Sequence, residues 1–76
     1  MHHAYERWTE GERNAYNLKD VAMRILLTEP NIKSIDYVSV ASMSTLEEVD
    51  LVSGRAILSA AVEMGSVRLI DNMILE

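Results

Sequence analysis

The stretch RAILSAAVEMGSVRLIDNMILE, which runs from Arg55 to Glu76, decides the fold. Two runs of β-branched and aliphatic residues flank the dipeptide Gly65-Ser66. A two-residue loop that begins with glycine is typical of the type II′ turn between antiparallel strands. The sequence therefore predicts a β-hairpin with strands over 55–64 and 67–75.

The two faces of this hairpin specify its register. One face is apolar at every position but one: Ala56, Leu58, Ala60, Val62 and Met64, opposite Leu75, Met73, Asp71, Leu69 and Val67. The second face carries two opposite-charge pairs, Glu63 with Arg68 and Arg55 with Glu76. Each such pair adds about 0.2–1 kcal/mol. A slip of one residue would mix the two sets, so we expect a single register.

The second face is only partly polar, because Ile57 and Ala61 lie opposite Ile74 and Ile70 in this register. A sheet that is apolar on both sides needs cover on both sides. One helix can cover one side. We expect the spare face to be covered by an upstream segment, a neighbouring domain or a second copy of the chain.

The region upstream supplies a third strand and a helix. Residues 34–41 (SIDYVSVA) alternate and are rich in β-branched residues, which predicts a strand. Residues 17–27 (NLKDVAMRILL) carry apolar side chains at helical spacing, with Asn17 as the expected N-cap and Pro30 beyond the end. Residues 1–13 could form the tail of a helix that begins further upstream.

Between the predicted strands, Ser44-Thr45-Leu46-Glu47 fits a capping box, which predicts a short helical turn over 45–49. The expected fold is therefore α+β, with one domain over 1–76. It contains a three-stranded antiparallel sheet (34–41, 55–64, 67–75) with the helix 17–27 packed on one face.

Composition excludes several classes of protein. The chain has 76 residues, 49% of them hydrophobic and 25% charged, a balance that is ordinary for a folded domain. A domain of this size hides only about 60% of its unfolded surface, which leaves little room for a complete catalytic apparatus. A net charge of −5 opposes a broad nucleic-acid interface. The sequence has no cysteine, no apolar run long enough to span a membrane and no signal peptide, so we expect a cytoplasmic protein.

A search for chemical motifs finds none of the phosphate-loop, dinucleotide or H-E-x-x-H type. His2-His3 is either a fragment of a metal site or a pair left by cloning or chance, because two adjacent histidines alone make a poor site. Glu47, Glu48 and Asp50 form either a divalent-cation site or a solvated turn; their spacing matches no calcium loop. Met43, Met64 and Met73 are either core filler or part of an adaptable groove.

Asp71-Asn72 has two interpretations. Asp71 falls on the otherwise apolar hairpin face, where a buried carboxylate needs a partner. Either Asp71 bonds to loop amides and fixes the fold, or Asp71 and Asn72 reach a ligand or a partner domain. Arg68 points to the opposite face in the predicted register.

Several segments together resemble the C-terminal domain of the pantothenate synthetase (pantoate–β-alanine ligase) family, over roughly residues 11–75. They are S-I-D-Y-V-S-V (34–40), T-L-E-E (45–48), G-R-A-I-L-S-A-A-V (54–62), Gly65 and R-L-I-D-N (68–72). Gly11-Glu12-Arg13 is similar to the family's loop before its second helix. The family commonly has a basic residue and threonine after the hairpin glycine, where this chain has Ser66-Val67. That departure puts any phosphate or partner contact made from the turn in doubt.

The resemblance implies a whole enzyme that joins pantoate to β-alanine through a pantoyl-adenylate, with ATP and Mg²⁺. Its Rossmann-like N-terminal domain, with a His-x-Gly-His element, is absent from this sequence. The C-terminal domain would act as a hinged lid that excludes water. The resemblance assigns no catalytic, cofactor-binding or metal-binding residue to this chain.

We therefore expect this chain to be inactive alone and to form a homodimer through Ile57, Ala61, Ile70 and Ile74. Two alternatives remain at this stage: a stand-alone interaction or regulatory module with a borrowed fold, and a small ligand-binding domain that uses Asp71 and Asn72.

Overall fold

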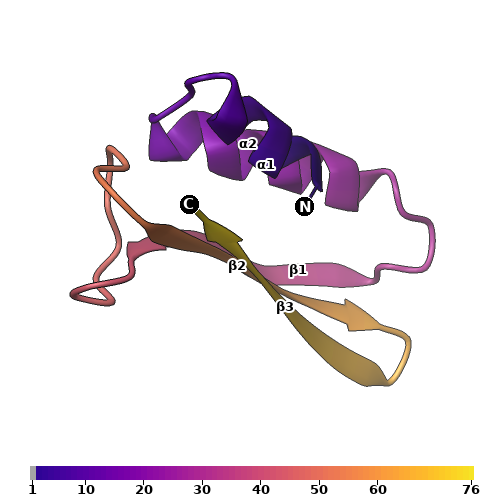
Figure 1. The fold of residues 1–76 in the computed structure, drawn as a ribbon. Coiled ribbons are helices and arrows are strands. Elements are labelled where there is room, and N and C mark those ends of the chain that lie inside the picture. The colour runs from indigo at the N-terminus through magenta and orange to yellow at the C-terminus, as the bar shows by residue number, and fades with distance from the viewer. Residues whose placement is uncertain (1) are drawn as a thin grey trace.

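The computed structural model describes residues 2–76 and contains two helices and a three-stranded sheet (Figure 1). In chain order the elements are α1 (His2–Thr9), α2 (Ala15–Leu27), β1 (Ser34–Ser42), β2 (Ala56–Met64) and β3 (Val67–Leu75). The sheet is antiparallel in the order β1-β2-β3, and both helices lie over the same face of it (Figure 1). The predicted α+β class and the three predicted strands are confirmed.

The β2–β3 hairpin has the predicted register, with Ala56 opposite Leu75 and Met64 opposite Val67. Gly65 has a φ of 64° and Ser66 does not lie at positive φ, as a type II′ turn requires. The predicted charge pair at the open end is also present, because Arg55 Nε lies 2.7 Å from Glu76 Oε2. Turn chemistry and side-chain alternation were therefore sufficient to specify this half of the sheet.

The second predicted pair, Glu63 opposite Arg68, is confirmed in register, but the side chain of Arg68 has a different ionic partner. Glu63 does lie opposite Arg68 in the ladder, but Arg68 Nε donates to Asp36 Oδ2 at 2.7 Å instead. The β1–β2 register shifts between Ile35 and Tyr37, which leaves Asp36 as the extra residue of a bulge. A bulge redirects side chains, and here it makes Asp36 the carboxylate that Arg68 reaches across β2.

Helix α2 begins two residues before the predicted start. Its N-cap is Asn14, whose Oδ1 accepts hydrogen bonds from the amides of Tyr16 (2.9 Å) and Asn17 (3.3 Å). The prediction of Asn17 as the cap is therefore wrong, because buried Ala15 extends the apolar stripe by one turn. The helix ends at Leu27, and Pro30 lies beyond it as predicted.

Helix α1 accounts for most of the segment 1–13, and Met1 lies outside the described residues. Tyr5 and Trp8 lie one turn apart, with ring centroids 6.0 Å from each other. Arg13 closes the end of this helix: its guanidinium lies 4.5 Å above the Trp8 ring and donates to the Trp8 carbonyl at 2.6 Å. The loop between the helices, which includes Gly11 and Glu12, is thereby fixed.

The predicted helical turn over 45–49 is wrong. A single turn closes earlier, with Leu46 N donating to Ser42 O at 2.8 Å. Leu46 then adopts a φ of 62°, which ends any helix, and Glu48 pairs with Ala41 in an isolated bridge. The hydroxyl of Ser42, rather than that of Ser44, accepts the turn amides, so the expected capping box does not form.

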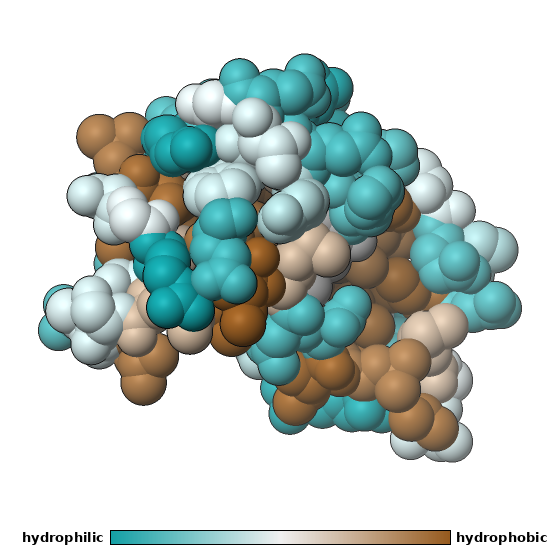
Figure 2. Space-filling view, viewed as in Figure 1, coloured by the Kyte–Doolittle hydropathy of each residue, from teal (hydrophilic) through white to brown (hydrophobic). Residues whose placement is uncertain are grey.

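The core lies between the helices and one face of the sheet. It consists of residues with little or no exposure from both layers: Ala4, Ala15, Leu18, Ala22, Val40, Val52, Ala56, Leu58 and Leu75. The first helix meets the last strand in this core, since α1 contacts β3 (Figure 1). The outer half of the hairpin twists away from the helices, and hydrophobic side chains gather over it (Figure 2).

Candidate functional site

The face of the sheet that the helices leave uncovered is the main candidate surface; we call it the open face. By strand alternation and register it carries Tyr37, Ser39 and Ala41 from β1, Ile57, Ser59 and Ala61 from β2, and Ile70, Asn72 and Ile74 from β3. Its largest side chains are exposed, Tyr37 by 41%, Ile70 by 56% and Ile74 by 43%. The predicted spare apolar face is therefore present.

Ion pairs border the open face at both ends of the hairpin. Arg68 pairs with Asp36 near the turn, and Arg55 pairs with Glu76 at the other end. Both pairs are largely solvated, so each contributes little to stability. Between these charged ends two apolar rows, Tyr37-Ala61-Ile70 and Ala41-Ile57-Ile74, lie on either side of a polar central row. Two serines on it, Ser39 and Ser59, lie opposite each other in the ladder.

Asp71 is exposed, so the prediction of a buried carboxylate at this position is wrong. The residue does lie on the helix-side face, opposite the buried Ala60, but on the edge strand β3, where its side chain is exposed. Its Oδ1 accepts a hydrogen bond from the backbone amide of Asn72 at 3.0 Å. The structure therefore places a backbone contact here, within the strand rather than to a loop.

The acidic residues Glu47, Glu48 and Asp50 have exposed side chains, while their backbones hold the loop together. Glu47 O accepts from Ser42 N at 2.9 Å, and Asp50 O accepts from Ala15 N at 2.8 Å. Among residues 2–76, no three His, Asp or Glu side chains gather in a way that could hold a metal ion. The geometry favours the solvated-turn interpretation.

The remaining candidates from the sequence do not come together. His2 Nε2 lies 2.9 Å from Glu6 Oε1 on exposed helix surface, and His3 only meets the ring of His2 edge-on. Met43, Met64 and Met73 are each half-buried, at separate places on the sheet and its adjoining loop. They lie apart and do not form a shared groove.

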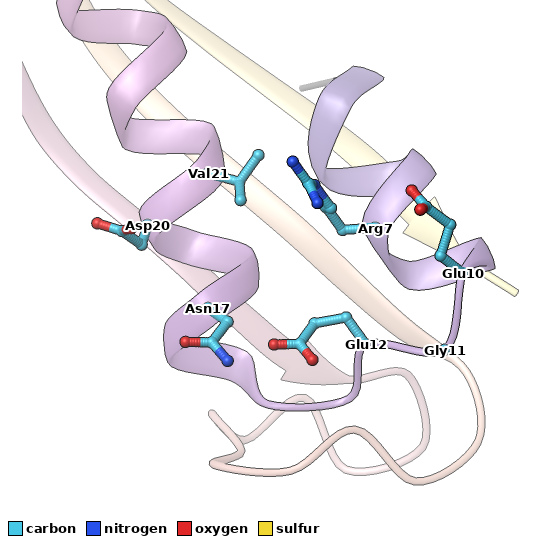
Figure 3. A pocket seen from close by; sticks show the side chains of 7 residues that line it. All are labelled: Arg7, Glu10, Gly11, Glu12, Asn17, Asp20 and Val21. Carbon is cyan, nitrogen blue, oxygen red and sulfur yellow. The ribbon is translucent and has the colours of Figure 1, made fainter.

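A hollow of about 560 Å³ lies between the end of α1 and the start of α2 (Figure 3). Three of its seven lining residues are acidic, and the full lining is Arg7, Glu10, Gly11, Glu12, Asn17, Asp20 and Val21. Arg7 extends toward Val21, whereas Asp20 points away from the space between the helices (Figure 3). The hollow is open to solvent and offers no nucleophile beside a base, so its geometry does not define a catalytic centre.

Sequence reasoning missed two residues that organise the helix layer. Arg13 caps α1 and stacks on Trp8, and Asn14 caps α2. The signal for Asn14 was present, because Asn14 and Asn17 are equally suitable cap residues three positions apart. Neither helix in the described residues is long and apolar enough to cross a membrane.

The fold and the open face together define a class: a two-layer α+β domain that leaves one face of its sheet uncovered. Comparison with known proteins narrows this class. The family described as pantoate–beta-alanine ligase matches residues 1–74. Because the match covers nearly the whole chain, the chain belongs to the pantoate–beta-alanine ligase family.

Curated relatives agree with this assignment. The chain is 45% identical to the pantothenate synthetase of Roseiflexus sp. (strain RS-1) over 71 residues, which is 93% of this chain and 25% of that protein. It is 47% identical over 66 residues to the pantothenate synthetase of Carboxydothermus hydrogenoformans, covering 87% of this chain and 23% of that protein. The chain thus spans about a quarter of these relatives and matches their C-terminal domain.

Proposed function

We propose that this chain is the covering domain of a pantoate–β-alanine ligase, and that its open face docks over the larger part of that enzyme. The observation that carries this proposal is the open face itself, with three large apolar side chains exposed around a sheet that is closed on its other side. A surface of this kind marks an interaction site. Family membership indicates which enzyme is covered.

The chemistry of ligation explains why a cover is useful. An amide forms from a carboxylate only after the acyl group has been activated, and water competes with the amine for an activated acyl group. Closure of a second domain excludes that water. In this proposal the chain supplies an apolar wall and leaves the reacting groups to its partner, and the fragment is inactive alone.

The residues of this chain do not fit the ATP and Mg²⁺ that the family resemblance implies. Gly11, Gly54 and Gly65 stand in three separate loops, so they form no phosphate-binding loop. The described acidic residues do not converge into a metal site. We therefore place nucleotide and metal binding in the remaining three quarters of the ligase.

A complementation experiment tests the proposal. The Roseiflexus pantothenate synthetase, shortened by the C-terminal quarter that this chain matches, is mixed with the chain, and pantothenate formation is measured. We expect the mixture to restore at least tenfold more activity than either part gives alone. Pantothenate formation by the isolated chain, or no gain on mixing, would contradict the proposal.

Two matched variants report on the surface used. Ile70 is 56% exposed on the open face, and Val67 is 55% exposed on the helix-side face of the same strand. We expect Ile70→Glu to remove complementation and Val67→Glu to retain it. A second copy on the open face, which the sequence also suggested, would compete with the ligase domain, and complementation would then fall as the chain concentration rises.

A further inference from the structure

Strand β3 is a long, regular edge strand whose only charged residues are Arg68 and Asp71. Its sequence, VRLIDNMIL, has no proline, glycine or lysine, and its ladder with β2 runs from Val67 to Leu75 without a register shift. Natural sheets normally shorten, kink or charge such edges to prevent association. On the helix-side face of β3 the only charged residue is Asp71.

The outward backbone groups of β3 can be assigned from the turn. In a two-residue hairpin the flanking pair, Met64 and Val67, is hydrogen-bonded, and bonded pairs then alternate along the ladder. The outward N–H and C=O groups therefore belong to Arg68, Ile70, Asn72 and Ile74. Among them, the Asn72 amide donates to its neighbour Asp71, a local contact that a partner carbonyl can replace.

The side chains at these outward positions form a self-complementary series on the open face. With Glu76, which directly follows the strand, they read in order Arg68, Ile70, Asn72, Ile74 and Glu76: cation, apolar, amide, apolar, anion. A two-fold axis through Asn72 reverses the series. Arg68 then faces Glu76 of a second copy, Ile70 faces Ile74, and Asn72 faces itself, so the opposed pairs on the open face are favourable. On the helix-side face the same register sets Leu69 against Leu75 and Asp71 against Met73.

Neighbouring registers are worse. An axis through Asp71 would place two carboxylates directly opposite each other, and like charges in that position are destabilising. An axis through Met73 would set Ile70 against Glu76 and Asp71 against the buried Leu75. Asp71 thus disfavours both alternatives and leaves the register through Asn72.

The existing ion pairs leave the end charges available to a second copy. Arg68 binds Asp36 through Nε and its side chain is 53% exposed, while Glu76 binds Arg55 through Oε2 and is also 53% exposed. The terminal nitrogens of Arg68 and the second carboxylate oxygen of Glu76 can therefore meet across the edge. Asp36 and Arg68 of one copy would then continue into Glu76 and Arg55 of the other, so that negative and positive charges alternate. The two-fold symmetry gives the dimer two such rows of four charges.

We propose that β3 pairs antiparallel with β3 of a second copy about a two-fold axis at Asn72, so that one sheet runs through both copies. The occupant is a second copy because the series complements its own reversal. The open faces of the two copies become continuous, and both remain free for the docking proposed above. This inference is independent of the proposed function, and its tests need only the chain.

Cysteine cross-linking tests the register, since the chain has no cysteine of its own. Hydrogen-bonded partners in antiparallel strands have Cα atoms about 5.5 Å apart, within the range of a disulfide. We expect Asn72→Cys to form disulfide dimers on mild oxidation. Ser59→Cys, on the central strand beside Asn72, is the matched control and should stay monomeric.

A second pair of variants makes this test stricter. Ile70→Cys alone should cross-link poorly, whereas a mixture of Ile70→Cys and Ile74→Cys should give mixed disulfide dimers. Equal cross-linking of Ser59→Cys and Asn72→Cys, or efficient self-linking of Ile70→Cys, would overturn the proposal.

Charge reversal tests the ends of the pairing by sedimentation or light scattering. Arg68→Glu and Glu76→Arg should each raise the dimer Kd by about tenfold, because two attractive pairs become repulsive. Mixing the two variants should restore association, since each interface then regains opposite charges. A dimer Kd that neither charge reversal changes would refute edge pairing. Edge pairing would also be refuted if the wild-type chain stayed monomeric and Asn72→Cys failed to cross-link.

Discussion

Asn14 joins the two layers of the molecule at the scale of one residue. Its side chain caps α2 by accepting from the amides of Tyr16 and Asn17. Its backbone forms an isolated bridge with Leu51, in the long loop before β2. The start of the helix and the path of that loop are therefore fixed at one point.

We expect Asn14→Ala to lower the free energy of unfolding by about 1 kcal/mol, because two helix amides lose their acceptor. Asn14→Asp should retain most of the stability, since a carboxylate also caps a helix. Urea denaturation of both variants measures the difference.

Asn17→Ala is the control for this prediction, because Asn17 lies inside the first turn and alanine is the better helix former there. Its effect should be neutral or slightly stabilising. If Asn17→Ala were the more damaging change, the assignment of the cap to Asn14 would be wrong.

At the scale of single residues, the sequence predicted that an asparagine caps α2 but did not predict which one. Asn14 and Asn17 are the same amino acid three residues apart, and only the burial of Ala15 decides between them. Asp71 was expected to be buried because its neighbours on the strand are apolar. Asp71 lies on the edge strand of the sheet, and which strand forms the edge depends on the order of the strands and not on the alternation within one of them.

At the scale of an element, the hairpin depends on Gly65. Its φ of 64° is unfavourable for any residue with a Cβ, while a Cβ built there would meet no atom within 4 Å. The requirement for glycine is thus conformational and not steric crowding by neighbours. This is why the dipeptide Gly65-Ser66 identified the turn and the register so well.

We expect Gly65→Ala to destabilise the domain by about 1–2 kcal/mol, the usual penalty of a left-handed backbone for an L-residue. Gly65→Asn should be milder, because asparagine tolerates this region. Ser66→Ala should change stability by less than about 0.5 kcal/mol. Thermal unfolding of the three variants, followed by circular dichroism, gives the order, and equal losses at Gly65 and Ser66 would contradict it.

The loop between β1 and β2 shows where element prediction failed. Ser44 to Glu47 has the composition of a capping box, but Ser42 captures the turn amides first and Leu46 enters the left-handed region. The competing contacts are tertiary: Ser42 N bonds to Glu47 O, and Val49 N bonds to Val40 O. The segment after β1 therefore forms backbone hydrogen bonds with the end of that strand instead of a helical turn.

At the scale of the whole molecule, the sheet is covered on one side only. The sequence predicted both the closed face and the spare one from alternation along a single hairpin. It did not predict the bulge at Asp36 or the ion pair with Arg68, because these depend on how β1 is placed against β2. The alternation of residues along the hairpin specified the two faces of the sheet. The ion pair at the border of the open face depends on contacts between strands that are distant in the sequence.

This one-sided architecture predicts weak binding of small substrates by the isolated chain. Calorimetric titration with ATP, pantoate and β-alanine should give no saturable heat, because the described residues hold neither a phosphate loop nor a metal cluster. Saturable binding at micromolar concentration would contradict this expectation. If a variant at Asp71 or Asn72 abolished that binding, the ligand-binding alternative would be favoured.

Because α1 contacts β3, the domain completes its core only after its last strand has been synthesised. Ala4 and Leu75 are both fully buried in the same core, although nearly the whole chain separates them. A nascent polypeptide can form α2 on the ribosome, but its core stays incomplete until Leu75 has left the exit tunnel. Until Leu75 has emerged, the apolar surfaces of this domain are open to chaperones.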